Sequence, residues 1–101
     1  MRIADRVAGA GELCAADLEA GVWFRRLEDG SARFFRVSDG VVERSASGIP
    51  YRLVNVFGGS SDGRVWVSRM RADFPVVVLS FAEVVAAFDS LSVLRPVVAG
   101  A

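Results

Sequence analysis

The stretch that decides the fold spans residues 22–43 and reads VWFRRLEDGSARFFRVSDGVVE. Two runs rich in aromatic and β-branched residues flank the pair Asp29-Gly30, which readily adopts the backbone angles of a tight hairpin turn. A second such pair, Asp39-Gly40, follows the second run at once. The stretch therefore predicts a three-stranded antiparallel meander.

A hairpin tip at Asp29-Gly30 fixes which residues lie opposite each other. Trp23 then faces Arg36, and a tip at Asp39-Gly40 would place Arg36 opposite Glu43. Side chains alternate between the two faces of a strand. One face is uniformly apolar and is expected to form the core: Val22, Phe24, Phe35 and Val37. The other face is mixed: Trp23, Arg25, Leu27, Phe34, Arg36, Val41 and Glu43.

The rest of the chain predicts further strands and one helix. Strands are expected at 51–57, 65–70 and 76–79, and the last of these is apolar enough to be covered on both faces. Ser80-Phe81-Ala82-Glu83 forms a capping box, which predicts a helix over 80–91. Its apolar stripe is expected to face the sheet: Phe81, Val84, Val85, Phe88 and Leu91. Its solvent side is expected to carry Ala82, Glu83, Ala86 and Asp89.

The two ends of the chain carry weaker patterns. Residues 1–21 predict a short helical turn that closes at Gly21, and residues 12–14 are candidates for pairing with a sheet edge. Residues 92–101 form a tail, or a closing edge strand at 93–98 in which Pro96 is tolerated only because the strand is at an edge.

These elements predict one domain over residues 1–101, mostly β with one C-terminal helix and with antiparallel strands over 22–79. The expected architecture is a small antiparallel barrel or a strongly bent meander sheet. The layout is compatible with SH3-like and related small barrels, a fold analogy that implies no function. No motif in the sequence belongs to a family that can be named.

Composition limits the class of protein. The 101 residues suffice for one domain, and 52% hydrophobic with 24% charged residues indicates a globular chain. Twelve basic and twelve acidic residues cancel, so no net charge attracts nucleic acid or a membrane surface. All of the basic residues are arginine, which favours a GC-rich genome and hence a bacterium or its phage.

The location expected from the sequence is the cytoplasm. The first residues are charged rather than apolar, unlike a signal peptide, and no run is long enough to span a bilayer. Cys14 is the single cysteine, so no internal disulfide forms. We expect it to be a small buried hydrophobe, because the sequence contains no histidine that could activate the thiol.

The inventory of reactive side chains predicts a protein that is not an enzyme and holds no cofactor or metal. Without histidine or lysine there is no imidazole base, no Schiff base and no phosphate-binding loop of the Gly-Lys-Ser/Thr type. The carboxylate pairs Asp17 with Glu19 and Glu28 with Asp29 lie in expected turns. The amides of residues 58–61 could cradle an anion, but a flexible hairpin loop is the simpler interpretation.

One group of side chains points to binding. Trp23, Arg25, Phe34 and Arg36 share the mixed face of the first hairpin, and we expect them to form a solvent-exposed surface for a partner. Trp and Arg are enriched at the centres of protein interfaces. Alternating Arg and aromatic residues also serve single-stranded nucleic acid binding, although a neutral chain is poorly suited to it. A purely structural face is the third interpretation, because arginine stems cover apolar surface, cation–π contacts occur in many sheets, and another register would bury this face under the helix.

The function expected from these patterns is a small intracellular protein-interaction module, including a phage- or mobile-element-encoded inhibitor of a host complex. A nucleic-acid-binding small β-barrel is one alternative. A structural homodimeric subunit is another, joined through a sheet edge or the outer face of the helix, because apolar runs at 76–79 and 93–98 need cover.

Overall fold

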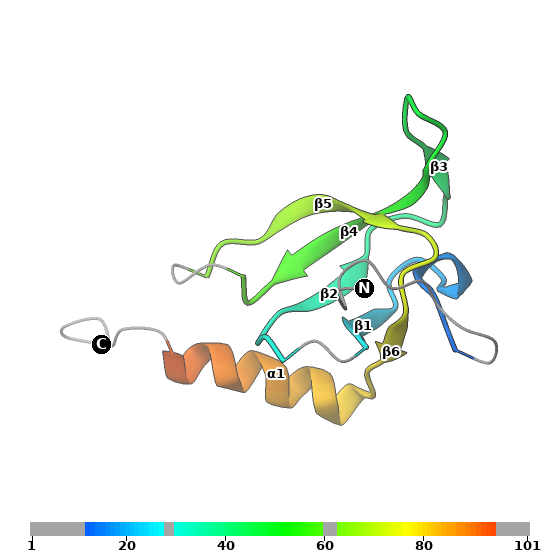
Figure 1. Ribbon diagram of the computed structural model, residues 1–101. Helices are drawn as coiled ribbons and strands as arrows, with labels where there is room; N and C mark the ends of the chain where they lie inside the picture. The colour runs from blue at the N-terminus through cyan, green and yellow to red at the C-terminus, as the bar shows by residue number, and fades with distance from the viewer. Residues whose placement is uncertain (1–11, 28–29, 60–62, 95–101) are drawn as a thin grey trace.

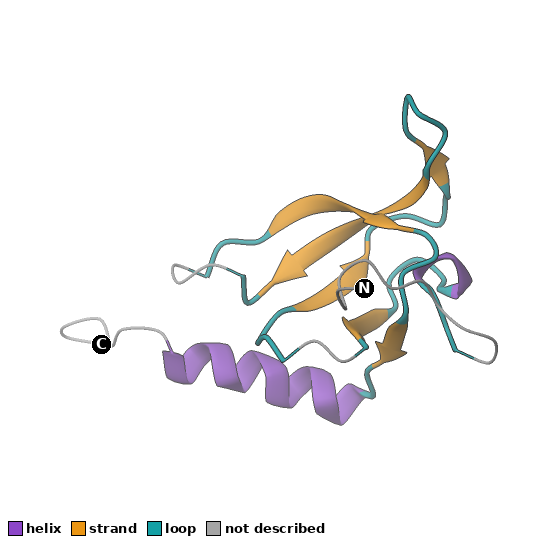
Figure 2. Ribbon diagram, in the orientation of Figure 1, coloured by secondary structure: helices purple, strands orange, loops and turns teal. Residues whose placement is uncertain are grey.

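In the computed structural model the described residues are 12–27, 30–59 and 63–94, the last three of them as backbone only. Within them, one antiparallel sheet of six strands is followed by one helix (Figures 1 and 2). The expectation of a mostly β chain with a C-terminal helix is confirmed. The elements in chain order are the 3-10 helix η2 (Ala15–Asp17), β1 (Trp23–Arg26), β2 (Phe34–Val37), β3 (Glu43–Arg44), β4 (Pro50–Phe57), β5 (Trp66–Arg71), β6 (Val76–Val78) and α1 (Phe81–Leu94).

The sheet is open. Its strands follow the order β5–β4–β2–β1–β6, and β3 lies beside the first residues of β4. No pairing joins β5 to β6 in the described part of the chain, so of the two expected architectures the barrel is wrong and the sheet is open. The outer edge of β6 is instead covered by the chain before η2, where Cys14 pairs with Pro75 and the Val76 amide donates to the Leu13 oxygen at 3.0 Å. This confirms the expected edge pairing of that segment.

The first hairpin has the predicted register. Trp23 lies opposite Arg36 and Phe24 lies opposite Phe35. The predicted tip falls partly on residues 28–29, which lie outside the described residues. The aromatic and β-branched pattern therefore determines which side chains share a face, because a slip of one residue would exchange the two faces.

The predicted meander is wrong at its third strand. The second neighbour of β2 is β4 rather than β3, so Arg36 lies opposite Asn55 and not opposite Glu43. Val54 of β4 lies opposite Val37, and both are buried, whereas Val41 and Val42 after the second Asp-Gly pair are exposed. The alternating apolar residues of β4 form a longer run than the residues after Gly40, so pairing with β4 buries more apolar surface against β2. Because burying apolar surface stabilises a fold, β4 is the favoured neighbour.

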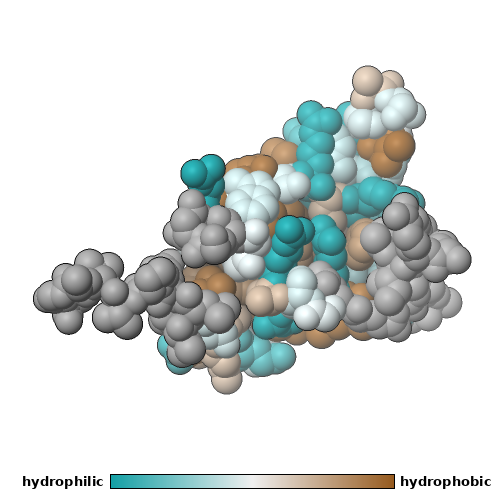
Figure 3. Space-filling view, turned by 60° about the vertical axis from the view of Figure 1, so that its left-hand side comes forward, coloured by the Kyte–Doolittle hydropathy of each residue, from teal (hydrophilic) through white to brown (hydrophobic). Residues whose placement is uncertain are grey.

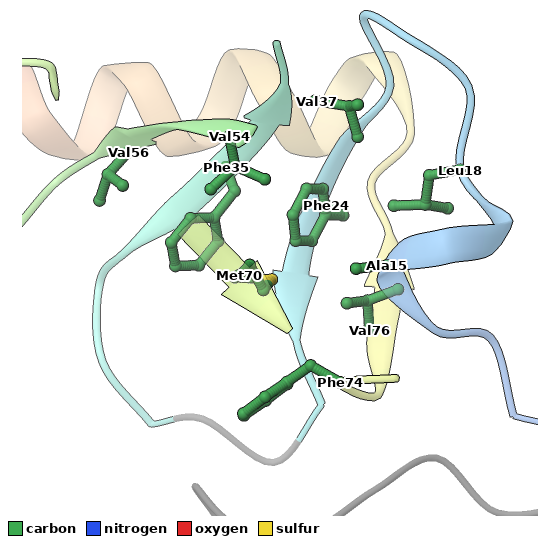
Figure 4. Close-up of a cluster of buried hydrophobic side chains, with 10 residues drawn as sticks. All are labelled: Ala15, Leu18, Phe24, Phe35, Val37, Val54, Val56, Met70, Phe74 and Val76. Atoms are coloured by element: carbon green, nitrogen blue, oxygen red, sulfur yellow. The ribbon is translucent and has the colours of Figure 1, made fainter. Parts of the chain in front are cut away.

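The main core lies on one face of the sheet (Figure 4). Phe24 and Phe35 stack there with ring centroids 5.3 Å apart, which confirms that the uniformly apolar face points inward. The cluster draws its side chains from five strands, from the segment around η2 and from the turn between β5 and β6: Ala15, Leu18, Phe24, Phe35, Val37, Val54, Val56, Met70, Phe74 and Val76. The strand β6 is not covered on both faces as expected, because Val77 and Val78 are 42% and 41% exposed.

The helix begins with the predicted capping box. The Ser80 amide donates to Glu83 Oε1 at 3.0 Å, and the Glu83 amide donates to Ser80 Oγ at 3.2 Å. The helix continues to Leu94, so the edge strand expected from residue 93 is wrong at its first two positions. Residues 95–98 lie outside the described residues.

The helix packs on the second face of the sheet with three of the five predicted residues, Val84, Phe88 and Leu91, whereas the prediction is wrong for Phe81 and Val85. Val84, Ala87 and Leu91 face the sheet beside Leu79 and the rings of β1, β2 and β4. Phe81 is 86% exposed, and Val85 is also exposed. Ala87, by contrast, is 5% exposed within this cluster. The predicted solvent side is confirmed: Ala82, Glu83, Ala86 and Asp89 are all exposed.

Candidate functional site

The four residues expected to form an exposed surface differ in how far the rest of the fold covers them. Phe34 has no exposed surface, and Trp23 is half-buried against the same cluster under α1. Arg25 is half-buried and Arg36 is exposed. The expectation of a solvent-exposed face is therefore wrong for Phe34 and only partly met for Trp23 and Arg25. The predicted register is correct. The prediction of exposure failed because α1 covers part of the second face of the sheet, so the face opposite the main core is not wholly in solvent.

The covered part of this face is an aromatic cluster that holds the helix in place. The rings of Phe34 and Phe57 stack at 5.3 Å, and the Trp23 ring lies 4.9 Å from that of Phe57. Phe88 meets the Phe34 ring edge-on at 5.0 Å and 85°. Stacked and edge-on aromatic pairs add to the stabilisation from buried area alone. This end of the face is a second core.

Arg25 also belongs to the covered part. Its Nη1 donates to the Arg33 main-chain oxygen at 3.3 Å. The pKa of Glu83 is lowered mainly because its carboxylate accepts from the Ser80 amide, and the nearby charge of Arg25 contributes in the same direction. Its hydrogen bond to Arg33 thus ties Arg25 to the main chain just before β2.

Beyond the helix the same face stays open, and we call this region the open face. It is defined by Arg36, Tyr51, Leu53, Asn55, Val67, Arg69 and Arg71, which the strand registers place on one side of β2, β4 and β5. One row runs across three strands from Arg36 through Asn55 to Val67. Arg36, Val67, Arg69 and Arg71 are exposed. Figure 3 shows hydrophilic and hydrophobic residues interspersed on the side of the molecule that it presents.

Aromatic rings position two arginines of the open face. The guanidinium carbon of Arg69 lies 4.7 Å from the centre of the Tyr51 ring, and that of Arg36 lies 5.9 Å from the centre of the Trp23 ring. A cation over a ring face is attracted by the ring quadrupole, and the arginine stem gains apolar contact. The two positive charges are therefore presented from a restricted set of side-chain conformations.

The third arginine of the open face is engaged with a carboxylate. Arg71 donates to both oxygens of Asp73 at 3.1 and 2.9 Å, in a pair whose side chains are about half exposed. Glu43 lies opposite Tyr51 at the margin of the face. The open face and its margin thus carry three arginines and two carboxylates, a net charge of +1, although the whole chain is neutral.

Sequence reasoning found Arg36 and missed Arg69 and Tyr51. The alternation of β4 places Tyr51 and Leu53 on one face, and the alternation of β5 separates Arg69 from the buried Met70. These two patterns could have placed Arg69 and Tyr51 on exposed faces of their strands. Their meeting depends on the register of β4 with β5, where Leu53 lies opposite Arg69. The loop between these strands is too long to fix that register from sequence.

Of the other candidate groups, Asp17 and Cys14 interact with each other at the start of η2. The Asp17 carboxylate accepts from the Cys14 amide at 2.9 Å, which lowers its pKa. Partial burial is the main cause of the raised pKa of the Cys14 thiol, which keeps it protonated. Glu28, Asp29 and residues 60–61 lie outside the described residues. Among those described, no three His, Cys, Asp or Glu side chains are grouped so that they could hold a metal ion.

Two findings concern the chain as a whole. Among the described residues, no helix combines the length and the apolar character needed to cross a membrane. Comparison with protein-family models, curated proteins and solved structures returns no match for this chain.

Proposed function

We propose that this chain is a small, non-enzymatic protein-interaction module that binds an acidic partner through its open face. The observation that carries the proposal is the pair of exposed arginines, Arg36 and Arg69, each held over an aromatic ring on a face that also exposes Val67. Arginine and aromatic residues dominate the binding energy of many protein interfaces. Positioned guanidinium groups suit carboxylates because they donate in a fixed fork.

The same geometry supports a protein partner over a nucleic acid. Base stacking needs an aromatic ring with an accessible face. Here the Trp23 ring lies between aromatic neighbours and Arg36, and the Tyr51 ring carries Arg69. The balanced total charge also argues against phosphate binding along an extended path.

The proposal includes the cytoplasmic location expected from the sequence. In that compartment an unpaired cysteine stays reduced.

Affinity capture from the native host tests the proposal. The tagged chain is compared with the Arg36→Glu, Arg69→Glu double variant, with and without nuclease. Arg44→Glu is the matched control, because Arg44 is an exposed arginine on a strand residue opposite Pro50 and so on the other face from Tyr51. We expect the wild type and the control to capture the same nuclease-resistant protein and the double variant to lose it. Loss on nuclease treatment, or full capture by a folded double variant, would contradict the proposal.

A homodimeric structural subunit is the second candidate, because α1 exposes a large apolar stripe. Phe81 is 86% exposed, and Val85, one turn later, is 43% exposed. Large exposed apolar patches commonly mark interaction surfaces. Light scattering separates the candidates: a mass near 10.8 kDa at high protein concentration rejects the dimer. A doubled mass that returns to the monomer value in Phe81→Asp would support it.

A further inference from the structure

The strand β5 borders the open face and has one edge without a neighbouring strand in the described part of the chain. It pairs with β4 along its whole length, from Trp66 to Arg71. The opposite end of the sheet differs, because the segment around Cys14 covers β6 there. In Figure 1, β5 is the outermost long strand. An uncovered edge offers main-chain donors and acceptors to a further strand.

The hydrogen-bond pattern of the sheet identifies which groups that edge offers. The Ala72 amide donates to the Pro50 oxygen at 3.0 Å, and the Ser38 amide donates to the Leu53 oxygen at 3.0 Å. In an antiparallel ladder, hydrogen-bonded pairs alternate with pairs whose polar groups point away. Continued along β5, this alternation turns the main-chain groups of Ser68 and Met70 toward β4. The N–H and C=O groups of Val67 and Arg69 therefore point outward from the edge.

The side chains beside these groups define what kind of strand fits. Val65 and Val67 are 47% and 55% exposed, and Arg69 follows on the same face. A strand added to β5 would meet an apolar side chain and a guanidinium two residues apart. Side chains directly opposite each other in neighbouring strands interact, and opposite charges stabilise the pair.

We propose that an extended acidic segment of the partner adds to β5 as a further strand, with a carboxylate beside Arg69 and an apolar side chain beside Val67. The inference rests on the proposed function and specifies how the partner is held. Hydrogen bonds to the main chain of Val67 and Arg69 supply affinity, and the alternate side chains supply specificity.

A second copy of this chain fits the same edge less well. Two antiparallel copies of β5 centred on Arg69 would oppose two guanidinium groups directly. Centring them on Ser68 would place each Arg69 opposite a valine and give it no carboxylate. Like charges directly opposite destabilise a strand pair, so charge complementarity favours an acidic partner over self-pairing.

The test uses the full chain, isotope-labelled, and a synthetic extended peptide with capped ends in which valine and glutamate alternate with threonine. A peptide with lysine in place of glutamate is the charge control. We expect the acidic peptide to protect the Val67 and Arg69 amides from hydrogen exchange and to leave the Ser68 and Met70 amides unchanged. The lysine peptide should protect neither pair. Protection of no β5 amide by the acidic peptide would overturn the inference.

Two variants at one position separate main-chain from side-chain binding. Val67→Pro removes the N–H group that points outward from the edge. The fold should tolerate this proline because that N–H group makes no hydrogen bond to β4. Val67→Thr keeps the N–H and serves as the matched control. We expect the proline variant to bind the acidic peptide about tenfold more weakly and the threonine variant to bind about as well as wild type. Equal binding by a folded Val67→Pro variant would overturn the inference.

The outcomes distinguish this inference from the proposed function. If Val67→Pro leaves binding intact but Arg36→Glu with Arg69→Glu abolishes it, the open face binds without strand addition and only the inference fails. If the arginine variant binds the acidic peptide as well as wild type, the proposed function fails too. A doubled mass in light scattering that Val67→Pro abolishes would show that β5 pairs with a second copy, and would overturn the acidic partner.

Discussion

Arg52 donates a 2.7 Å hydrogen bond from Nη1 to the main-chain oxygen of Leu18, 34 residues earlier in the chain. The same guanidinium donates to the oxygens of Ala15 at 3.1 Å and Asp39 at 2.8 Å. The side chain is 1% exposed. One buried cation thus joins β4 to the segment around η2 and to the loop after β2, and main-chain dipoles stabilise its charge.

Replacing Arg52 by methionine should destabilise the fold by about 3 kcal/mol or more. The change keeps apolar volume but removes the Arg52 donor from the buried Leu18 oxygen and the part-buried Asp39 oxygen and weakens the bonding of the Ala15 oxygen, and each unsatisfied buried acceptor costs about 1–3 kcal/mol. The free energy of unfolding from urea titration measures the effect. Arg44→Met is the control, because Arg44 is exposed and donates to the oxygen of the nearby Gly48. Equal stability of the two variants would show that the Arg52 bonds contribute nothing net.

Phe34→Ala should destabilise the protein by about 3–5 kcal/mol, as much as Phe24→Ala on the other face of the sheet. Both rings are fully buried, one under α1 and one in the main core. Phe81→Ala should change stability by less than about 1 kcal/mol, because most of that ring is in solvent. Thermal unfolding followed by circular dichroism ranks the three variants. A stable Phe34→Ala protein would mean that α1 does not cover this face in solution.

Gly58→Ala should destabilise the protein much more than Gly48→Ala. Both glycines have positive φ, near +76° and +83°, a conformation that costs an alanine about 1–2 kcal/mol. A Cβ at Gly58 would lie 2.7 Å from the Ala32 main-chain oxygen, whereas a Cβ at Gly48 would meet nothing within 4 Å. The difference between their unfolding free energies isolates the steric part. Equal decreases in unfolding free energy would mean that the main chain near Ala32 moves aside for the new Cβ without destabilising the protein.

Ser80→Ala should reduce stability by about 1 kcal/mol through loss of the helix N-cap. Unfolding free energies of the two proteins check this loss.

The capping box also makes stability depend on pH. Hydrogen bonds from Ser80 lower the pKa of Glu83 in the folded state. The contribution of the Glu83 carboxylate to stability is therefore present above the ordinary carboxyl range and is lost as pH falls through the lowered pKa. Glu83→Gln should therefore be less stable than wild type near neutral pH, and the difference should shrink in acid. Unfolding midpoints at two pH values check the trend; a difference that grows in acid would contradict it.

Local patterns in the sequence specified much of the fold. The hairpin register around Phe24 and Phe35, the alternation along β4 and the capping box at Ser80 all follow from residues close in the chain. Each is decided by side-chain period or by a turn of a few residues, so neighbours in sequence carry the necessary information.

Such local patterns predicted only part of the candidate site. Arg36 was found because it lies in the first hairpin beside Trp23. Arg69 and Tyr51 were missed because they meet through the pairing of β4 with β5. The buried role of Arg52 was also missed, since its acceptors are main-chain oxygens more than ten residues away.

The sequence by itself therefore determined the strand and helix content, the first register and the inward face that carries Phe24. The tertiary structure alone decided that β4 replaces β3 beside β2, that the sheet stays open and that α1 buries Phe34. The physical reason is that long-range pairing is chosen by the total apolar area that competing arrangements bury. That total depends on which distant segments meet, a quantity that no local pattern contains.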